Sequence, residues 1–169
     1  MSKAVSVAAK LPNVGLLTLH ASGGTAVMQA AREAAGSGKN GPKLLAVTVL
    51  TSFDEATLRE IGMSGSIETR AVTLGRLAKK AGMDGVVCSA HEARAIRRAC
   101  GAKFIILIPG VRPRSGPAND QSRIATPAEA IRAGADYLVV GRPITAAQDP
   151  RSAVAAIVDE MKSASRRTR

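Results

Sequence analysis

Aromatic residues are scarce in this sequence of 169 residues, which has no tryptophan, one tyrosine and two phenylalanines. Proteins that bind single-stranded nucleic acids stack bases on aromatic side chains, so the scarcity argues against that class of function. The two cysteines, Cys88 and Cys100, are too few for a disulfide-stapled secreted domain and lack metal-ligand spacing. We therefore expect buried free thiols, a reducing cytoplasm and no metal site.

Long hydrophobic runs and an export signal are missing as well. The stretch from Leu44 to Leu50, interrupted only by Thr48, has the size of a strand and is far shorter than the roughly 18 residues that a membrane span needs. Lys10 and Pro12 cut short the apolar region near the start, and no small-residue cleavage site follows. The sequence predicts a soluble, cytoplasmic chain without a membrane partner.

Acidic residues are outnumbered, since 13 Asp and Glu face 24 Lys and Arg, a formal net charge of +11. Such a surplus suits an anionic partner, either a phosphate ester or a nucleic acid. The low aromatic content disfavours nucleic acid. Part of the surplus lies in residues 162–169, which we interpret as a basic C-terminal tail.

Short apolar runs alternate with longer segments of helical spacing, which predicts an α/β protein with a parallel sheet covered by helices. The expected strands are Val14 to Leu19, Leu44 to Leu50, Gly85 to Val87, Phe104 to Ile108 and Tyr137 to Val140. The expected helices are Ser2 to Leu11, Thr25 to Ala35, Asp54 to Ile61, Ile67 to Ala81, Ala90 to Ala99, Pro127 to Ala133 and Arg151 to Lys162. No change in composition marks a boundary, so residues 1–169 are expected to form a single domain.

Several helix ends carry recognisable signals. Thr126, Pro127 and Glu129 have the spacing of a capping box with proline at the first helical position. Residues 64–66 precede another expected helix. Glycines stand where helix C-caps are needed, at Gly82, Gly101 and Gly134.

Small and polar residues follow the apolar runs, at the strand ends where parallel α/β proteins collect their chemistry. The turn Gly141-Arg142-Pro143 combines a bare backbone, a guanidinium and a helix start, which is typical of a phosphate site. An ordinary glycine turn with a solvated arginine is the alternative. The loop at 112–124 is long enough to be a functional lid and carries Arg112 and Gln121.

The segments LLTLHASGG, LAVTVLTS, GVVCSAHEA, IPGVRPRSGPANDQSRIATPAEAI and GADYLVVGRPIT resemble the last five strand-loop modules of bacterial orotidine 5'-phosphate decarboxylases. The resemblance runs from about Lys3 to Asp159. It implies an incomplete (β/α)8 TIM barrel, with five parallel strands equivalent to strands 4–8 of that fold. It also implies a lyase of pyrimidine biosynthesis, usually a homodimer, that converts orotidine monophosphate to uridine monophosphate and CO2 without a metal or organic cofactor.

The resemblance places six residues on the family's substrate-binding positions: Thr51, Ser89, Arg112, Gln121, Gly141 and Arg142. Among these, Gln121 and Arg142 would grip the phosphate, and Ser89 would address the pyrimidine amide. The implied ligand is orotidine or uridine monophosphate or another phosphorylated small molecule. We expect Arg142, Gln121 and Arg112 to converge on a space the size of a phosphate.

The sequence departs from the family at the catalytic centre. The proton donor of the family is a lysine between carboxylates in a DxKxxD motif, and that motif is missing here together with strands 1–3. The chain resembles a decarboxylase cut after its catalytic motif, so we assign no catalytic residue and expect negligible decarboxylation by the chain alone. A non-catalytic, nucleotide-binding partial barrel is the alternative.

The remaining candidates have simpler interpretations. His20 is expected to be a satisfied structural histidine, His91 a surface residue, and Asp136 a turn or cap residue. Asp54 and Glu55 fit the first turn of a helix. Five strands cannot close a barrel, so we also expect exposed apolar side chains on the concave side, with Val14, Leu16 and Leu138 as candidates, and association into homo-oligomers.

Overall fold

A single parallel sheet forms the centre of the protein. The computed structural model describes residues 1–36, 41–113 and 125–166. The strands in these ranges are β1 (Leu16–His20), β2 (Lys43–Val47), β3 (Gly85–Val87), β4 (Ile105–Pro109) and β5 (Tyr137–Val139). They pair side by side in sequence order, and every pair is parallel. The predicted α/β class and the five parallel strands are confirmed.

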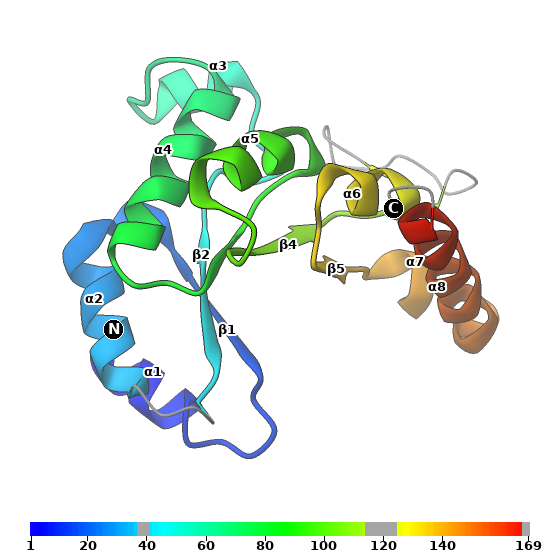
Figure 1. Ribbon diagram of the computed structural model, residues 1–169, viewed down its shortest axis with the longest axis horizontal. Coiled ribbons are helices and arrows are strands. Elements are labelled where there is room, and N and C mark those ends of the chain that lie inside the picture. The colour runs from blue at the N-terminus through cyan, green and yellow to red at the C-terminus, as the bar shows by residue number, and fades with distance from the viewer. Residues whose placement is uncertain (37–40, 114–124, 167–169) are drawn as a thin grey trace.

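Helices connect the strands and cover one side of the sheet. They are α1 (Ser2–Ala8), α2 (Gly24–Ala35), α3 (Glu55–Glu60), α4 (Ile67–Lys80), α5 (Ala90–Cys100), α6 (Pro127–Ala133), α7 (Arg142–Thr145) and α8 (Pro150–Arg166), with a 3-10 turn η1 (Ala21–Gly23) after β1. Figure 1 shows α2, α4, α5 and α6 along the convex side of the curved sheet, while no drawn helix covers its concave side. The fold is therefore an open arc of strand-helix units.

The two faces of the sheet bury different sets of apolar residues, because successive side chains of a strand point to opposite faces. Leu44, Val86 and Ile106 face the helices and belong to the main core, which is completed by side chains of the covering helices. On the concave face, Leu45, Val87 and Leu107 form a separate small cluster. The central strands are thus apolar on both faces, as buried parallel strands are expected to be.

Most of the predicted helix signals are confirmed, whereas the C-cap of α4 is Ala81 and the predicted Gly82 lies one residue beyond it. The Thr126 hydroxyl accepts the Glu129 N–H at 3.2 Å, and the Glu129 carboxylate accepts the Thr126 N–H at 2.8 Å. Ser66 caps α4, since its hydroxyl accepts the N–H of Thr69. Gly101 and Gly134 are the C-caps of α5 and α6, with positive φ angles that glycine adopts at little cost.

Most element boundaries differ from the prediction by one to four residues; β2, for example, ends at Val47 and not at Leu50. Three helices show the clearest differences. The first helix ends at Ala8 rather than Leu11, because the chain turns at Asn13, whose φ of 65° lies in the left-handed region. The last helix continues to Arg166, so residues 162–166 of the predicted basic tail are helical, and the buried Ala164 anchors these final turns. The short helix α7 was not predicted, because four residues show no helical periodicity.

The concave side exposes fewer apolar residues than the sequence predicts. Leu138 pairs with Ile108 in the sheet register and packs against the helix-covered core, so its prediction as a concave residue is wrong by one register step. Leu16 does lie on the concave face, beside the small cluster there. Tyr137 and Val139 are the exposed apolar residues of β5, at 47% and 48% exposure. Leu45, Val87 and Leu107 of the concave face are buried, and Leu16, Val47 and Ile105 beside them are partly buried.

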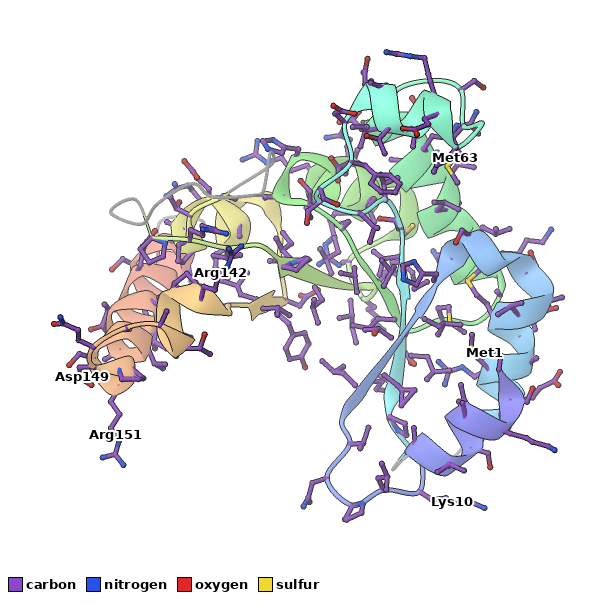
Figure 2. All side chains as sticks on the ribbon, turned by 180° about the vertical axis from the view of Figure 1, so that it is seen from behind. Met1, Lys10, Met63, Arg142, Asp149 and Arg151 are labelled. Carbon is purple, nitrogen blue, oxygen red and sulfur yellow. The ribbon has the colours of Figure 1, made fainter. Side chains whose placement is uncertain are left out.

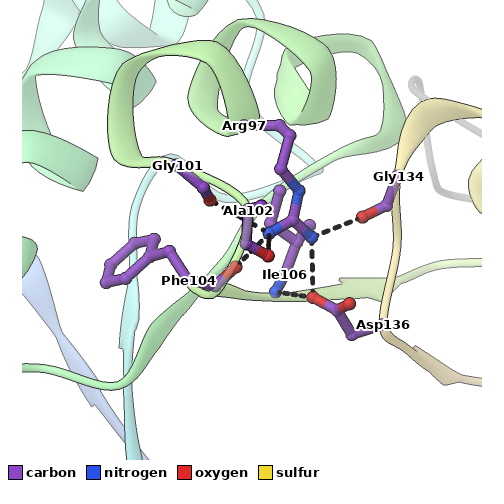
Figure 3. A network of polar contacts seen from close by, with 7 residues as sticks. All are labelled: Arg97, Gly101, Ala102, Phe104, Ile106, Gly134 and Asp136. Atoms are coloured by element: carbon purple, nitrogen blue, oxygen red, sulfur yellow. Dashed lines mark hydrogen bonds and ion pairs between the residues drawn. The ribbon is translucent and has the colours of Figure 1, made fainter.

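At the amino edge of the sheet, Arg97 of α5 joins β4 to β5 (Figure 3). Its guanidinium donates to the carbonyl oxygens of Ala102 and Gly134, each at 2.9 Å, and to Asp136 Oδ2 at 2.7 Å. The same Oδ2 accepts the backbone N–H of Ile106 at 2.8 Å. Asp136 is therefore a structural residue, in line with its predicted non-catalytic role, although it joins strands rather than capping a turn.

Arg32 of α2 makes a comparable connection between β2 and β3. It donates to the Gly82 carbonyl oxygen at 2.9 Å and to the Asp84 carboxylate. Asp84 Oδ2 also accepts the N–H of Leu44 at 2.8 Å, and Lys43 Nζ lies 3.6 Å from Asp84 Oδ1. The amino edge of the sheet thus carries structural ion pairs.

Candidate functional site

The candidate site residues lie along the carboxyl edge of the sheet. Thr51 follows β2, Ser89 follows β3, Arg112 follows β4, and Gly141 with Arg142 follows β5. Because these four strands are parallel neighbours, their carboxyl ends lie at the same edge. The structure therefore brings these predicted residues to one rim of the sheet. Gln121 lies outside the described residues, so its predicted convergence with Arg112 and Arg142 stays a prediction.

Thr51 stands in the turn between β2 and α3 and is half-buried. The turn leads into Asp54, whose carboxylate accepts the Thr57 N–H at 2.7 Å as the N-cap of α3. Hydrogen bonds from the backbone and side chain of Thr57 lower the pKa of Asp54 below its usual value. Asp54 is therefore a deprotonated capping residue at neutral pH, as its position in the sequence predicts, and not a proton donor.

Ser89 is 1% exposed and is the N-cap of α5. Its hydroxyl oxygen accepts the His91 N–H at 3.1 Å, and Glu92 returns the contact by accepting the Ser89 N–H at 3.1 Å. This capping box was not predicted, although the spacing of Ser89 and Glu92 is its ordinary signal. The Ser89 side chain therefore stabilises the helix start at the carboxyl edge.

Arg112 is buried at 6% exposure, which is unusual for an arginine. Its backbone N–H donates to the Ala125 carbonyl oxygen at 3.0 Å, and Val111 forms a parallel bridge with Ala125. The chain thus leaves β4 and returns next to its own starting point before α6. The two ends of the predicted lid segment are tied together at the carboxyl edge.

A glycine and an exposed arginine follow the last strand, β5. Gly141 precedes α7, and its carbonyl oxygen accepts the N–H groups of Ile144 at 2.8 Å and of Thr145 at 3.1 Å. Arg142 is the first residue of α7 and is exposed (Figure 2). The start of α7 thus places the Arg142 guanidinium, a group that can bind anions, at the carboxyl edge of the sheet.

His20 is a titratable residue of this edge, at the end of β1, and it is exposed. Its imidazole makes no hydrogen bond within the described ranges, so its expected role as a satisfied structural histidine stays a prediction. The expected surface position of His91 is confirmed. The lysines in the described ranges lie on helices, between α1 and β1, or at strand starts, and none follows the carboxyl end of a strand: Lys3, Lys10, Lys43, Lys79, Lys80, Lys103 and Lys162.

Other kinds of site find little support in the part of the chain that the structure describes. No group of three or more His, Cys, Asp or Glu side chains there could hold a metal ion. Cys88 and Cys100 are both buried and free, as predicted. Each helix in the same ranges is too short or too polar to cross a lipid bilayer.

The sequence also resembles known proteins over nearly all of its length. The model of the orotidine 5'-phosphate decarboxylase / HUMPS family matches residues 1–157. A protein of Sodalis glossinidius named orotidine 5'-phosphate decarboxylase is 50% identical over 163 residues, which cover 96% of this chain and 64% of that protein. A Dichelobacter nodosus protein of the same name is 50% identical over 158 residues, which cover 94% of this chain and 69% of the relative.

Solved structures agree with these relatives. The crystal structure of orotidine 5'-phosphate decarboxylase from Lactobacillus acidophilus matches with a TM-score of 0.76 and 33% identity, covering 95% of this chain and 66% of that one. The chain thus spans about two thirds of the proteins that it matches. The sheet topology, the loop residues at its carboxyl edge and the match over residues 1–157 together show that the chain belongs to the orotidine 5'-phosphate decarboxylase / HUMPS family.

Proposed function

We propose that the chain provides the substrate-binding side of an orotidine 5'-phosphate decarboxylase and that its ligand is orotidine or uridine monophosphate. The observation that carries the proposal is the family match over residues 1–157, supported by the position of five of the predicted binding residues after neighbouring parallel strands: Thr51, Ser89, Arg112, Gly141 and Arg142. The names of the relatives support the same substrate.

The phosphate is the chemical group that the basic loops suit best. Arg142 and Gly141 after β5, with Arg112 and Gln121 on the loop after β4, would hold the dianion, since guanidinium groups and backbone N–H groups both favour phosphate oxygens. Thr51 and Ser89 would face the remainder of the nucleotide, with Ser89 toward the pyrimidine amide. Contacts to a phosphate remote from the reacting carbon supply binding energy that orients the base.

Decarboxylation makes a further demand that these residues do not meet. The bond between C6 and the carboxylate carbon breaks, CO2 leaves, and the electron pair that stays on C6 must take up a proton. The sequence has no lysine in a DxKxxD motif, and none of the described lysines follows a strand end. We therefore propose that the 169 residues alone bind nucleotide and turn over orotidine monophosphate negligibly.

Calorimetric titration with uridine monophosphate tests the binding proposal. The 169-residue chain should bind the nucleotide, and Arg142→Ala should weaken binding about tenfold or more, as loss of a charge-assisted contact does. Arg151→Ala is the matched control, because Arg151 projects from the start of α8 into solvent (Figure 2). Equal affinities for the Arg142 variant and the unchanged chain would contradict the proposed phosphate contact.

A second experiment tests the reaction. CO2 release from carboxyl-labelled orotidine monophosphate is measured for the chain alone and for the chain mixed with the part of the Sodalis protein that it does not match. We expect release only from the mixture. Turnover by the chain alone would contradict the proposal that these 169 residues lack the group that protonates C6. Nucleotide binding without turnover in the mixture would indicate the alternative, a non-catalytic nucleotide-binding partial barrel.

The setting of this activity follows from the same proposal. We propose that the protein acts in pyrimidine biosynthesis in the cytoplasm, where buried free thiols such as Cys88 and Cys100 stay reduced. We also propose that it forms homo-oligomers, because the sheet ends in strands with exposed apolar side chains such as Val139.

A further inference from the structure

The helices α4 and α5 pack against each other on the convex side of the sheet (Figure 1). Gly75 of α4 is buried against α5, where a Cβ atom would make ordinary van der Waals contacts at 3.6 Å from both Cys100 Sγ and Ile96 Cγ2. A groove of about 400 Å³ remains where the two helices meet. Its lining residues are Glu68, Thr69, Val72, Thr73, Arg76, Ala95, Arg98 and Ala99.

The rim of this groove is basic. Arg76 of α4 and Arg98 of α5 are both exposed, and neither makes an ion pair or side-chain hydrogen bond within the described ranges. A second hollow, of about 490 Å³, lies at the end of the same helix pair and is lined by Lys79 and Lys103, which are likewise exposed and unpaired there. We call Arg76, Lys79, Arg98 and Lys103 the basic seam.

Few acidic groups balance the basic seam. Asp84 lines the second hollow, but its carboxylate is already held by Arg32 and by the Leu44 N–H. Glu68 lies at the opposite end of the groove, two turns of α4 before Arg76. The positive charge of the seam is therefore available to a partner.

We propose that the basic seam is a docking site for an acidic segment of a partner polypeptide. Its arginines can bind carboxylates in a bidentate fashion, and its cations extend over both hollows, as a segment with several carboxylates requires. The small apolar floor of Val72, Ala95 and Ala99 can receive apolar side chains that stand between those carboxylates.

Other ligands fit the same surface less well. Five of the eight residues that line the groove are exposed, so a small molecule would not be enclosed as ligand pockets usually require. A nucleic acid would find no aromatic side chain in the groove on which to stack a base.

Fluorescence anisotropy of the 169-residue chain tests the proposal with a labelled peptide of about twelve residues in which Glu and Ala alternate, at low ionic strength. The reference probes are a Gln-Ala peptide and an oligothymidine of the same length. The double variant Arg76→Gln and Arg98→Gln removes two charges of the seam. Arg151→Gln with Lys3→Gln is the matched control, because it removes the same charge from exposed residues on other helices.

We expect the acidic peptide to bind and the seam variant to bind it about tenfold more weakly, while the control variant changes little. Circular dichroism of both variants checks that the fold is kept. Arg76→Lys with Arg98→Lys keeps the charge but loses the bidentate geometry, so its affinity should lie between those of the unchanged chain and the seam variant. Equal losses in the seam and control variants would show attraction by net charge alone and overturn the proposal. Tighter binding of the oligothymidine, or no binding of the acidic peptide, would overturn it as well.

Discussion

Asp84 and Asp136 occupy equivalent positions in two similar units of the sheet. Each stands two residues after a glycine and directly before a strand, and each carboxylate joins an arginine of an earlier helix to a backbone N–H of the neighbouring strand. The units are Arg32 with Asp84 and Arg97 with Asp136. Each carboxylate therefore fixes the relative position of two strands and a helix at the amino edge.

Removing the charge of Asp84 should destabilise the fold. In Asp84→Asn the Arg32 guanidinium and the Leu44 N–H lose a charged acceptor in a partly buried place, which costs about 1–3 kcal/mol. Urea denaturation followed by circular dichroism measures the loss. Asp159→Asn serves as the control. Asp159 is exposed and its ion pair with the exposed Lys162 is long, at 3.8 Å, so its loss should change the unfolding free energy by less than about 0.5 kcal/mol.

The contribution of Asp84 to the unfolding free energy should depend on pH. Burial alone raises the pKa of Asp84, but the N–H of Leu44, the guanidinium of Arg32 and the ammonium of Lys43 outweigh burial and hold the pKa below its ordinary value. A lowered folded-state pKa stabilises the fold above the unfolded pKa of about 3.9, and the effect is lost as the pH falls through the folded-state pKa. The difference in unfolding free energy between the unchanged chain and Asp84→Asn should hold from pH 7 to about 5 and shrink below about 4. A difference that grows on acidification would contradict this account.

Gly85 is predicted to tolerate no side chain. A Cβ atom at this position would collide with the backbone carbonyl oxygen of Ile105 in the adjacent strand. Gly85→Ala should therefore separate β3 from β4 and cost more than about 3 kcal/mol, or prevent folding. Gly15→Ala is the control, because a Cβ atom at Gly15 would meet no other atom within 4 Å and the backbone there is not left-handed. Thermal melting of both variants compares them directly.

Ser89→Ala separates a structural role from a binding role. Loss of the N-cap should cost about 1 kcal/mol of stability, and Thr126→Ala should cost a similar amount because Thr126 heads a capping box of the same kind. If Ser89 also contacts the pyrimidine, only Ser89→Ala will weaken uridine monophosphate binding in a calorimetric titration. Equal affinities in the two variants would leave Ser89 as a capping residue alone.

Val139→Lys should reduce self-association of the chain. Val139 and Tyr137 are the exposed apolar side chains of β5 on the concave side, and a lysine discourages edge-to-edge contact between sheets. Light scattering should show a lower average mass for the variant than for the unchanged chain. Val7→Lys places the same charge on an exposed valine of α1 and should leave the mass distribution as it was.

The repeating architecture could be predicted from sequence because its signals are local. Apolar runs of strand length and helix caps such as Thr126 with Glu129 depend on neighbouring residues, and β3 and α6 have the predicted bounds. The facing of Leu138 could not be predicted, since the short apolar run from Tyr137 to Val140 shows no alternation of apolar and polar residues. Only the pairing of Leu138 with Ile108 determines its side of the sheet.

The candidate site was predictable in its residues but less so in their surroundings. The positions of Thr51, Ser89, Arg112 and Arg142 after parallel strands follow from the alternation of strands and helices. The burial of Arg112 does not, because it depends on how the chain returns at Ala125. The two arginine-aspartate connections were missed, since their partners lie 52 and 39 residues apart, although the repeated Gly-x-Asp spacing marks both aspartates.

The placement of the lysines has a practical consequence for handling this protein. Amine-reactive reagents modify lysine side chains, and those of the described ranges stand on helices, between α1 and β1, or before strands rather than after them. Acylation would therefore neutralise Lys79 and Lys103 of the basic seam while the arginine-lined carboxyl edge keeps its charge. Attachment to a support through amines would likewise leave the arginine side chains after β4 and β5 unmodified.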